Sequence, residues 1–192
     1  MAHFKAGFTI LAFFFSLTFL TAIKSETLFA RRLSAQDQFR LKPEKMTHLR
    51  FYLHDTLTGQ HPTAFPVAQA AITNTSSTFF GLVAVIDDPL TVTPDLNSTL
   101  VGRAQGMYAS SSQSEVALTI TMNLVFAEGA YNGSTLSVLG RNPILKNPRE
   151  LTIVGGTGVF RFARGYIQLR TYTYNATTNN AIVKYDVYAS HY

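Results

Sequence analysis

The 192-residue chain contains no cysteine, so the disulfides that stabilise many secreted proteins are excluded. Beyond its first segment, it has no apolar run of the roughly 20 residues that a membrane-spanning helix needs. It also has no segment with helical periodicity as strong as its strand patterns. The fold must therefore depend on a core built mainly from strands, either alone or with help from a partner subunit.

Several catalytic and ligand-binding motifs are missing as well. The glycine turn at residues 155–158 is not followed by Lys-Ser/Thr or by a predicted helix, which excludes a phosphate-binding loop. No Gly-x-Ser-x-Gly elbow occurs, so a hydrolase lacks its nucleophile. The histidines at 48, 54, 61 and 191 show no metal-ligand spacing. We expect neither a metal nor a cofactor.

The first segment has the form of a secretory signal peptide. Lys5 precedes an apolar stretch over residues 7–20, and small residues near Ala22 and Ser25 offer a cleavage site. Three hydroxyl side chains interrupt the apolar stretch, which disfavours a membrane anchor. We therefore assign residues 1–25 to a signal peptide and expect an extracellular protein.

Removal of that peptide takes away two lysines and no acid, so the formal charge falls from +5 to 14 − 11 = +3. Part of the excess lies in a polar segment at 26–46, which we interpret as a flexible N-terminal arm before a single domain at 47–192. The arm is either simply solvated or contacts an acidic polysaccharide. The expected secretion disfavours nucleic acid as a partner.

The chain carries four Asn-x-Ser/Thr sequons, which suits passage through the secretory pathway. They are Asn74, Asn97, Asn132 and Asn175. Asn132 belongs to an Asn-Gly pair between two apolar-rich strands, the strongest short signal for a hairpin. A tight turn presents a sequon poorly, so Asn74 and Asn97 are the better candidates for a glycan.

From residue 48 onward the chain reads as short strands separated by turn signals. The predicted strands are 48–55, 81–87, 102–110, 116–126, 135–139, 150–154, 160–174 and 181–189. This pattern indicates an all-β fold. Eight strands suit one closed antiparallel barrel, because closure removes exposed strand edges.

Strand alternation places Leu49, Phe51, Leu53 and Asp55 on one face, which we take to point inward. An apolar row would then end in a carboxyl group. Burial without a charged partner raises the pKa of such a group and suits it to proton transfer. Alternatively, Asp55 is a cap at the end of the strand.

The same alternation groups Gly102, Ala104, Gly106 and Tyr108. Three small residues beside an aromatic ring indicate either a cavity for a flat aromatic ligand or simple curvature of the barrel.

Asp87 and Asp88 look like an acid pair, but adjacent strand residues face opposite ways, and Pro89 is expected to end the strand. We interpret them as loop anchors.

The glycine turn at 155–158 precedes a further group of candidates. A sharp corner there would point Phe160, Phe162 and Arg164 toward one face of a sheet. That arrangement would place a cation in an aromatic wall.

Together, the segments 51–57, 85–91, 101–108, 123–129, 136–143, 154–166 and 185–188 resemble the dirigent proteins of plants, over residues 48–192. The resemblance implies an eight-stranded antiparallel β-barrel related to allene oxide cyclases. It also implies secretion to the apoplast and a homo-oligomer, with a trimer favoured over a dimer.

Dirigent proteins do not oxidise their substrates. A separate laccase or peroxidase makes phenoxy radicals from monolignols such as coniferyl alcohol, and the barrel holds two radicals so that they couple with one handedness. Acids then assist cyclisation of the quinone-methide product. By motif, Asp55 matches the family's acid, Arg164 matches the arginine of its Arg-Gly pair, and Tyr108 matches an aromatic residue that lines its cavity. The resemblance therefore leads us to expect Asp55 and Arg164 to face one cavity. Phe51, Phe160 and Phe162 are the other expected contacts to substrate.

One departure concerns Val159, which stands where lignan-forming members place a second acid. The chain therefore looks closer to the branch that includes the pterocarpan synthases, which close a ring by loss of water from an isoflavanol through a quinone methide. The resemblance to the family as a whole still implies, as our first prediction, stereoselective coupling of monolignol radicals in lignan and phenylpropanoid biosynthesis, without redox activity of its own. The alternatives are pterocarpan-type ring closure and a non-catalytic wall protein.

Overall fold

The structure, a computed structural model, describes residues 43–192. The predicted signal peptide and most of the predicted arm lie outside the described residues. Three single-turn 3-10 helices, η2 (Thr73–Thr75), η3 (Gly129–Tyr131) and η4 (Gly158–Phe160), lie in loops. The strands are β1 (Lys45–Asp55), β2 (Ala64–Ala68), β3 (Val83–Thr91), β4 (Leu100–Ser110), β5 (Leu118–Phe126), β6 (Thr135–Asn142), β7 (Arg149–Thr157), β8 (Arg164–Tyr174) and β9 (Ala181–His191).

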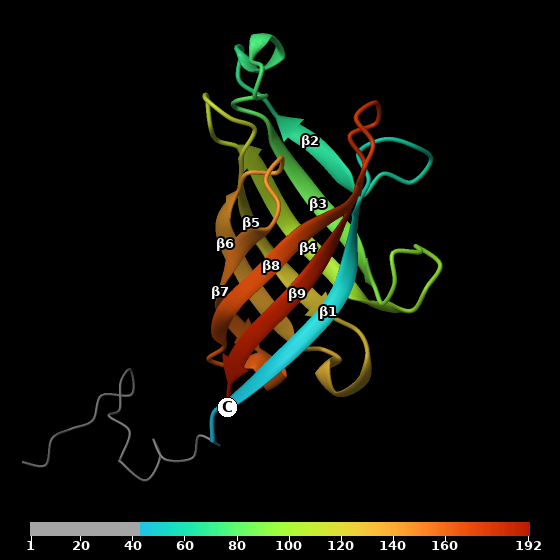
Figure 1. The fold of residues 1–192 in the computed structure, drawn as a ribbon, viewed down its shortest axis with the longest axis vertical. Helices are drawn as coiled ribbons and strands as arrows, with labels where there is room; N and C mark the ends of the chain where they lie inside the picture. Colours follow the sequence, from blue (N-terminus) through green and yellow to red (C-terminus); the bar gives the residue numbers. More distant parts are fainter. Residues whose placement is uncertain (1–42) are drawn as a thin grey trace, which may run out of the picture. The chain divides into compact units, whose positions relative to one another are not determined.

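The strands form one antiparallel sheet in the order β1-β9-β8-β7-β6-β5-β4-β3-β2. A further pairing of β1 with β3 closes this sheet into a barrel (Figure 1). The predicted eight-stranded antiparallel barrel is confirmed and consists of β1 and β3 to β9. Strand β2, which was not predicted, lies beside the first half of β3.

Alternate side chains fill the interior, as strand periodicity requires. Leu90, Leu124, Leu136, Ile167 and Val187 are fully buried. Burying each such side chain contributes roughly 1.5–3 kcal/mol relative to exposure. Of the described residues, none belongs to a helix long and apolar enough to cross a membrane.

The small residues of β4 are explained by the close approach of β5. A Cβ added at Gly102 would lie 2.2 Å from the Val125 carbonyl oxygen, and one at Gly106 would lie 2.3 Å from that of Thr121. Glycine is therefore needed because the two backbones nearly touch. This close approach of the two strands explains the glycines without a ligand cavity.

The loop between β5 and β6 differs from the predicted tight hairpin. Positive φ occurs at Gly129 (58°) and Gly133 (76°), whereas Asn132 has φ −51°. Asn132 and Gly133 do form a turn, in which the Ser134 N–H donates to the Tyr131 carbonyl oxygen at 2.9 Å. Helix η3 precedes this turn, so the connection is longer than a two-residue hairpin. The side chains of Asn74, Asn97, Asn132 and Asn175 are all exposed.

Candidate active site

Two inward-facing carboxyl groups meet where the barrel closes. Leu53 of β1 pairs with Leu90 of β3. Following this antiparallel register by two residues brings Asp55 opposite Asp88. The side chain of Asp88 lies deep in the barrel wall and is only 1% exposed. Asp55 is the last residue of β1, and this end of β1 lies toward the barrel mouth that is uppermost in Figure 1.

The prediction that Pro89 ends the strand is wrong, and this changes the interpretation of Asp88. Strand β3 continues through Pro89 to Thr91. The backbone N–H of Asp87 points to the Thr63 carbonyl oxygen beside β2. Pro89 comes two residues later, so its backbone nitrogen faces the same side of β3 as that of Asp87. At this point β2 has ended and the pairing with β1 has not yet begun. No strand there needs a hydrogen bond from the N–H that proline lacks.

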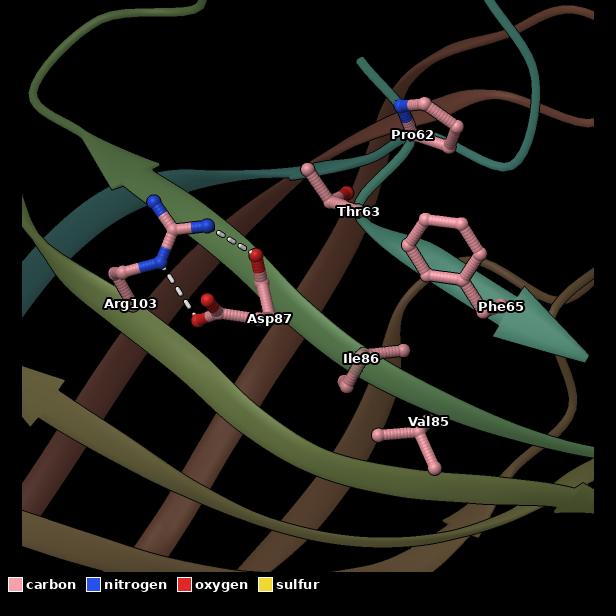
Figure 2. A pocket seen from close by; sticks show the side chains of 7 residues that line it. All are labelled: Pro62, Thr63, Phe65, Val85, Ile86, Asp87 and Arg103. Carbon is pink, nitrogen blue, oxygen red and sulfur yellow. Dashed lines mark hydrogen bonds and ion pairs between the residues drawn. The ribbon is translucent and has the colours of Figure 1, made fainter. Parts of the chain in front are cut away.

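Alternation along β3 then separates the adjacent acids. Asp87 points outward and accepts a hydrogen bond from Arg103 Nε at 2.6 Å, as Figure 2 shows. Together with Phe65 and Val85, this ion pair lines a shallow outer hollow of about 200 Å³. Asp88 points inward from within β3, so it is a candidate site residue and does not anchor a loop.

Burial controls the protonation of the inward pair. It raises the pKa of Asp55 to about 6. Burial, followed by the negative charge of Asp55, raises the pKa of Asp88 to about 8. The hydroxyl of Thr63 donates to Asp88 Oδ1 at 2.6 Å, which opposes the rise by favouring the charged form. At neutral pH the pair therefore shares one proton and carries one negative charge.

Two buried phenols face these carboxyl groups. Tyr108 comes from β4 and Tyr185 from β9. Burial, and then the charges of Asp55 and Asp88, raise the pKa of Tyr108 above its ordinary value. For Tyr185, burial and then the charge of Asp88 raise the pKa, while Arg149 opposes the rise. Both phenols therefore stay protonated and can act as hydrogen-bond donors.

Arg149 and Asn142 complete the group at the same mouth. Asn142 ends β6 and Arg149 begins β7, and both are buried. Arg149 Nη1 donates to Thr171 Oγ1 at 2.8 Å and to the Lys146 carbonyl oxygen at 2.9 Å. Within residues 43–192, three buried atoms lack any hydrogen-bond partner at this mouth: Asp55 Oδ1, Asn142 Oδ1 and Arg149 Nε.

We call this group the acid cluster; it comprises Asp55, Asp88, Tyr108, Asn142, Arg149 and Tyr185. It combines a protonated acid, a carboxylate and a guanidinium with unused hydrogen-bonding capacity. Buried polar atoms without partners are costly, so a polar ligand at this mouth would satisfy them. In residues 43–192 no three His, Asp or Glu side chains come together as a metal site. The chemistry available from these side chains is proton transfer to an oxygen-rich substrate.

The expectation that Arg164 shares a cavity with Asp55 is wrong. Asp55 pairs with Ala181 of β9, whereas Arg164 pairs with Ser190. Nine residues along one strand correspond to roughly 30 Å. The side chain of Arg164 is 61% exposed and forms an ion pair with Glu44.

The predicted strand at 160–174 begins later, which separates its three candidates. Helix η4 ends at Phe160, Phe162 has φ 62°, and β8 starts only at Arg164. Alternation therefore does not apply. Phe160 is fully buried, whereas Phe162 is 61% exposed.

The other predicted aromatic contacts are divided between the two ends of the barrel. Tyr108 belongs to the acid cluster. Phe51 stacks on Tyr185 with ring centroids 5.6 Å apart. Phe160 instead packs at the lower end, 5.2 Å from the ring of Tyr131.

Sequence reasoning missed Asn142 and Arg149 because the predicted strands were too short. The prediction ended one strand at residue 139 and began the next at 150, whereas β6 reaches Asn142 and β7 starts at Arg149. The inward alternation of Leu136 and Val138, continued by four residues, would have identified Asn142. The inward alternation of Leu151, continued by two residues toward the N-terminus, would have identified Arg149.

Comparisons with known proteins agree with this architecture. Residues 46–190 match the family model of dirigent-like proteins. Dirigent protein 21 of Arabidopsis thaliana is 52% identical over 150 residues, covering 78% of this chain and 79% of that protein. Pterocarpan synthase 1 of Glycyrrhiza echinata is 51% identical over 150 residues, covering 78% of this chain and 80% of that protein.

A solved structure of a pterocarpan synthase dirigent protein is 48% identical to this chain and superposes with a TM-score of 0.78. The match covers 85% of this chain and 99% of that structure. With its closed barrel and a family-model match across almost the whole described region, the chain belongs to the dirigent family.

Proposed function

We propose that the acid cluster promotes ring closure of a phenolic alcohol of the isoflavanol type, through a quinone methide and with loss of one water. The observation that carries this proposal is the adjacent pair Asp55 and Asp88, whose pKa values of about 6 and about 8 lie on either side of neutrality. An acid and a base side by side suit a reaction that first gives and then recovers a proton. The similarity to pterocarpan synthases supports the same choice.

In the first half of the proposed reaction, Asp88 gives its proton to the substrate's benzylic hydroxyl. The carbon–oxygen bond breaks and water leaves. The conjugated phenol of the substrate passes its proton to the Asp55 carboxylate, and a quinone methide forms. No electron is exchanged with an outside oxidant.

In the second half, another phenolic oxygen of the substrate bonds to the methide carbon and closes the ring. Its proton goes to the Asp88 carboxylate, while Asp55 returns its proton to the quinone oxygen. Both carboxyl groups regain their starting states, so the net change is loss of one water. The free Nε–H of Arg149 is available to an oxygen that becomes negative along this path.

The direct test uses purified protein, a panel of 2′-hydroxyisoflavanol stereoisomers and no oxidase, with products resolved by chiral chromatography. We expect pterocarpan from at least one isomer. Asp88→Asn should lower the rate about 100-fold or more, because the proton donor is lost. Asp87→Asn is the matched control, because that carboxyl group faces outward and pairs with Arg103. Failure of every isomer to react would reject ring closure.

Stereoselective coupling of monolignol radicals is the second candidate. The Phe51 ring, stacked on Tyr185 of the acid cluster, favours it, because flat phenoxy radicals would stack on such surfaces. Coniferyl alcohol and a laccase, with and without the protein, provide the test. Racemic products in both reactions would reject this candidate, and failure of both assays would leave the non-catalytic wall role.

We also propose that the protein assembles with copies of itself, with a trimer favoured, through an outward row of paired residues. The row crosses β2 to β6 and consists of Phe65, Val85, Met107, Thr121 and Leu139. Its four apolar members are each roughly half exposed. Such a row is apolar for a surface that faces only water. Light scattering should give a multiple of the subunit mass for the wild type and a lower multiple for Met107→Lys. A wild-type monomer would overturn the proposal.

Secretion to the apoplast with glycans on exposed sequons remains our proposal for location. Its support is the exposure of all four asparagine side chains. Enzymatic deglycosylation of protein secreted by plant cells should lower its apparent mass, and a protein recovered only inside the cells would contradict the proposal.

A further inference from the structure

A second hollow lies at the opposite end of the barrel from the acid cluster. Its volume is about 330 Å³, within the range of small-molecule sites. It forms where β3 has ended at Thr91 and pairs with β1 only at Tyr52 and Leu53. Its main lining residues are Arg50, Phe51, Val101, Phe126, Glu128 and Tyr131. We call it the lower hollow.

The walls of the lower hollow are aromatic and held from behind. The Phe126 ring lies 6.3 Å from those of both Phe51 and Tyr131, at steep angles. The fully buried Phe160 supports them, stacked on Tyr131 at 5.2 Å and tilted against Phe126 at 5.5 Å. Because packing already holds these side chains in place, a flat ligand ring can bind against them without ordering them first. This lowers the entropic cost of binding.

Opposite charges mark the rim. Arg50 donates through Nε to Asp186 at 2.6 Å, and its terminal nitrogens have no hydrogen-bond partner within residues 43–192. They can therefore take a carboxylate. Glu128 is exposed on the loop that carries η3 and can accept a hydrogen bond from a phenolic hydroxyl. The combination matches a flat ring that has a hydroxyl group at one end and a carboxylate at the other.

Phe51 separates this place from the acid cluster. Its ring lines the lower hollow and also stacks on Tyr185, whose phenol faces Asp88 and Asp55. A ligand in the lower hollow is therefore outside the reach of the two carboxyl groups. We propose that the lower hollow is a second binding site, which takes one planar phenolic acid of the hydroxycinnamate class per chain.

Isothermal titration with ferulic acid tests this directly. We expect about one equivalent to bind to the wild type and to Asp88→Asn alike, because the acid cluster is not involved. Ala130→Trp, in the exposed loop beside the hollow, should weaken ferulic acid binding at least tenfold by filling the space. Unchanged affinity in a folded Ala130→Trp protein would overturn the proposal.

A charge test separates the carboxylate contact from simple apolar binding. Arg50→Gln should weaken ferulic acid at least fivefold and leave the neutral coniferyl alcohol nearly unchanged. An equal effect on both probes would overturn the assignment of Arg50 to a carboxylate.

Amide chemical shifts provide a readout that is independent of any variant. Ferulic acid should shift the resonances of Val101 and residues 128–131 and leave those of Tyr108 and Arg149 in place. Shifts confined to the acid cluster would overturn the second site. This pattern does not depend on turnover, so failure of the proposed ring closure and failure of this proposal are distinguishable.

Discussion

Phe51 and Tyr185 are direct partners across β1 and β9, and their rings stack with planes 20° apart. Tyr185 belongs to the acid cluster, and Phe51 lines the lower hollow. One pair of rings therefore divides the interior into a proton-handling upper half and an aromatic lower half. Both halves depend on the same packing contact.

Phe51→Ala should destabilise the barrel by about 3–5 kcal/mol, because it removes a nearly fully buried ring and leaves a cavity. Urea denaturation would measure the change. Phe162→Ala is the control, since that ring is exposed and should cost less than about 0.5 kcal/mol. Similar losses for the two variants would contradict the assigned burial.

Asp88→Asn should change how stability depends on pH. In the folded protein the pKa values of Asp55 and Asp88 are raised to about 6 and about 8, from an ordinary value of 3.8. Between roughly pH 4 and pH 8 the folded protein thus binds more protons than the unfolded chain, so the wild type loses stability as pH rises.

Removing the Asp88 charge should eliminate most of that loss. We expect Asp88→Asn to match the wild type near pH 4 and to exceed it at pH 8 by on the order of 2 kcal/mol or more. Denaturation midpoints across this range would show the difference. Parallel curves for wild type and variant would mean that Asp88 is not titrating inside the barrel.

Gly106→Ala should prevent folding or lower the free energy of unfolding by about 2 kcal/mol or more. The reason is that the added Cβ would lie 2.3 Å from the Thr121 carbonyl oxygen. Gly155→Ala makes a matched pair with it, since a Cβ there meets nothing within 4 Å. Melting temperatures of the two variants are the measurement. A stable Gly106→Ala protein would show that β4 and β5 can separate without cost.

Arg164→Ala should leave ring closure or coupling selectivity within about twofold of the wild type. Its ion pair with Glu44 is exposed at the lower end, and such pairs contribute about 0–1 kcal/mol. The same activity assay applied to Arg149→Lys should show a loss of at least tenfold, because a buried guanidinium at the upper mouth is replaced. A large loss in Arg164→Ala alone would restore the assignment that the structure rejects.

The sequence predicted the barrel because strand alternation and turn residues are local signals. The inward position of Asp55 followed from the same alternation over Leu49, Phe51 and Leu53. Asp88, Asn142 and Arg149 were missed for one shared reason: their strands run past a proline or a polar residue that normally marks an end. Where a strand stops depends on its neighbour, and the gap beside Pro89 exists only because β1 and β2 share one side of β3.

The expected meeting of Asp55 and Arg164 failed for a different reason. Motif resemblance identifies residues but does not say at which end of a barrel they lie. That requires the register of β9, which pairs with both β1 and β8. Such long-range register is not encoded in any short window of sequence.

The pairing of β1 with β9 has a consequence for synthesis. Strand β1 is the first strand of the described chain, yet its long neighbour spans Ala181–His191, near the last residue. During translation, the edge of β1 that pairs with β9 therefore stays unpaired while the seven strands between them are synthesised. Contacts this distant in sequence slow folding and expose unpaired edges. A nascent chain of this protein should depend on chaperones until its final strand emerges.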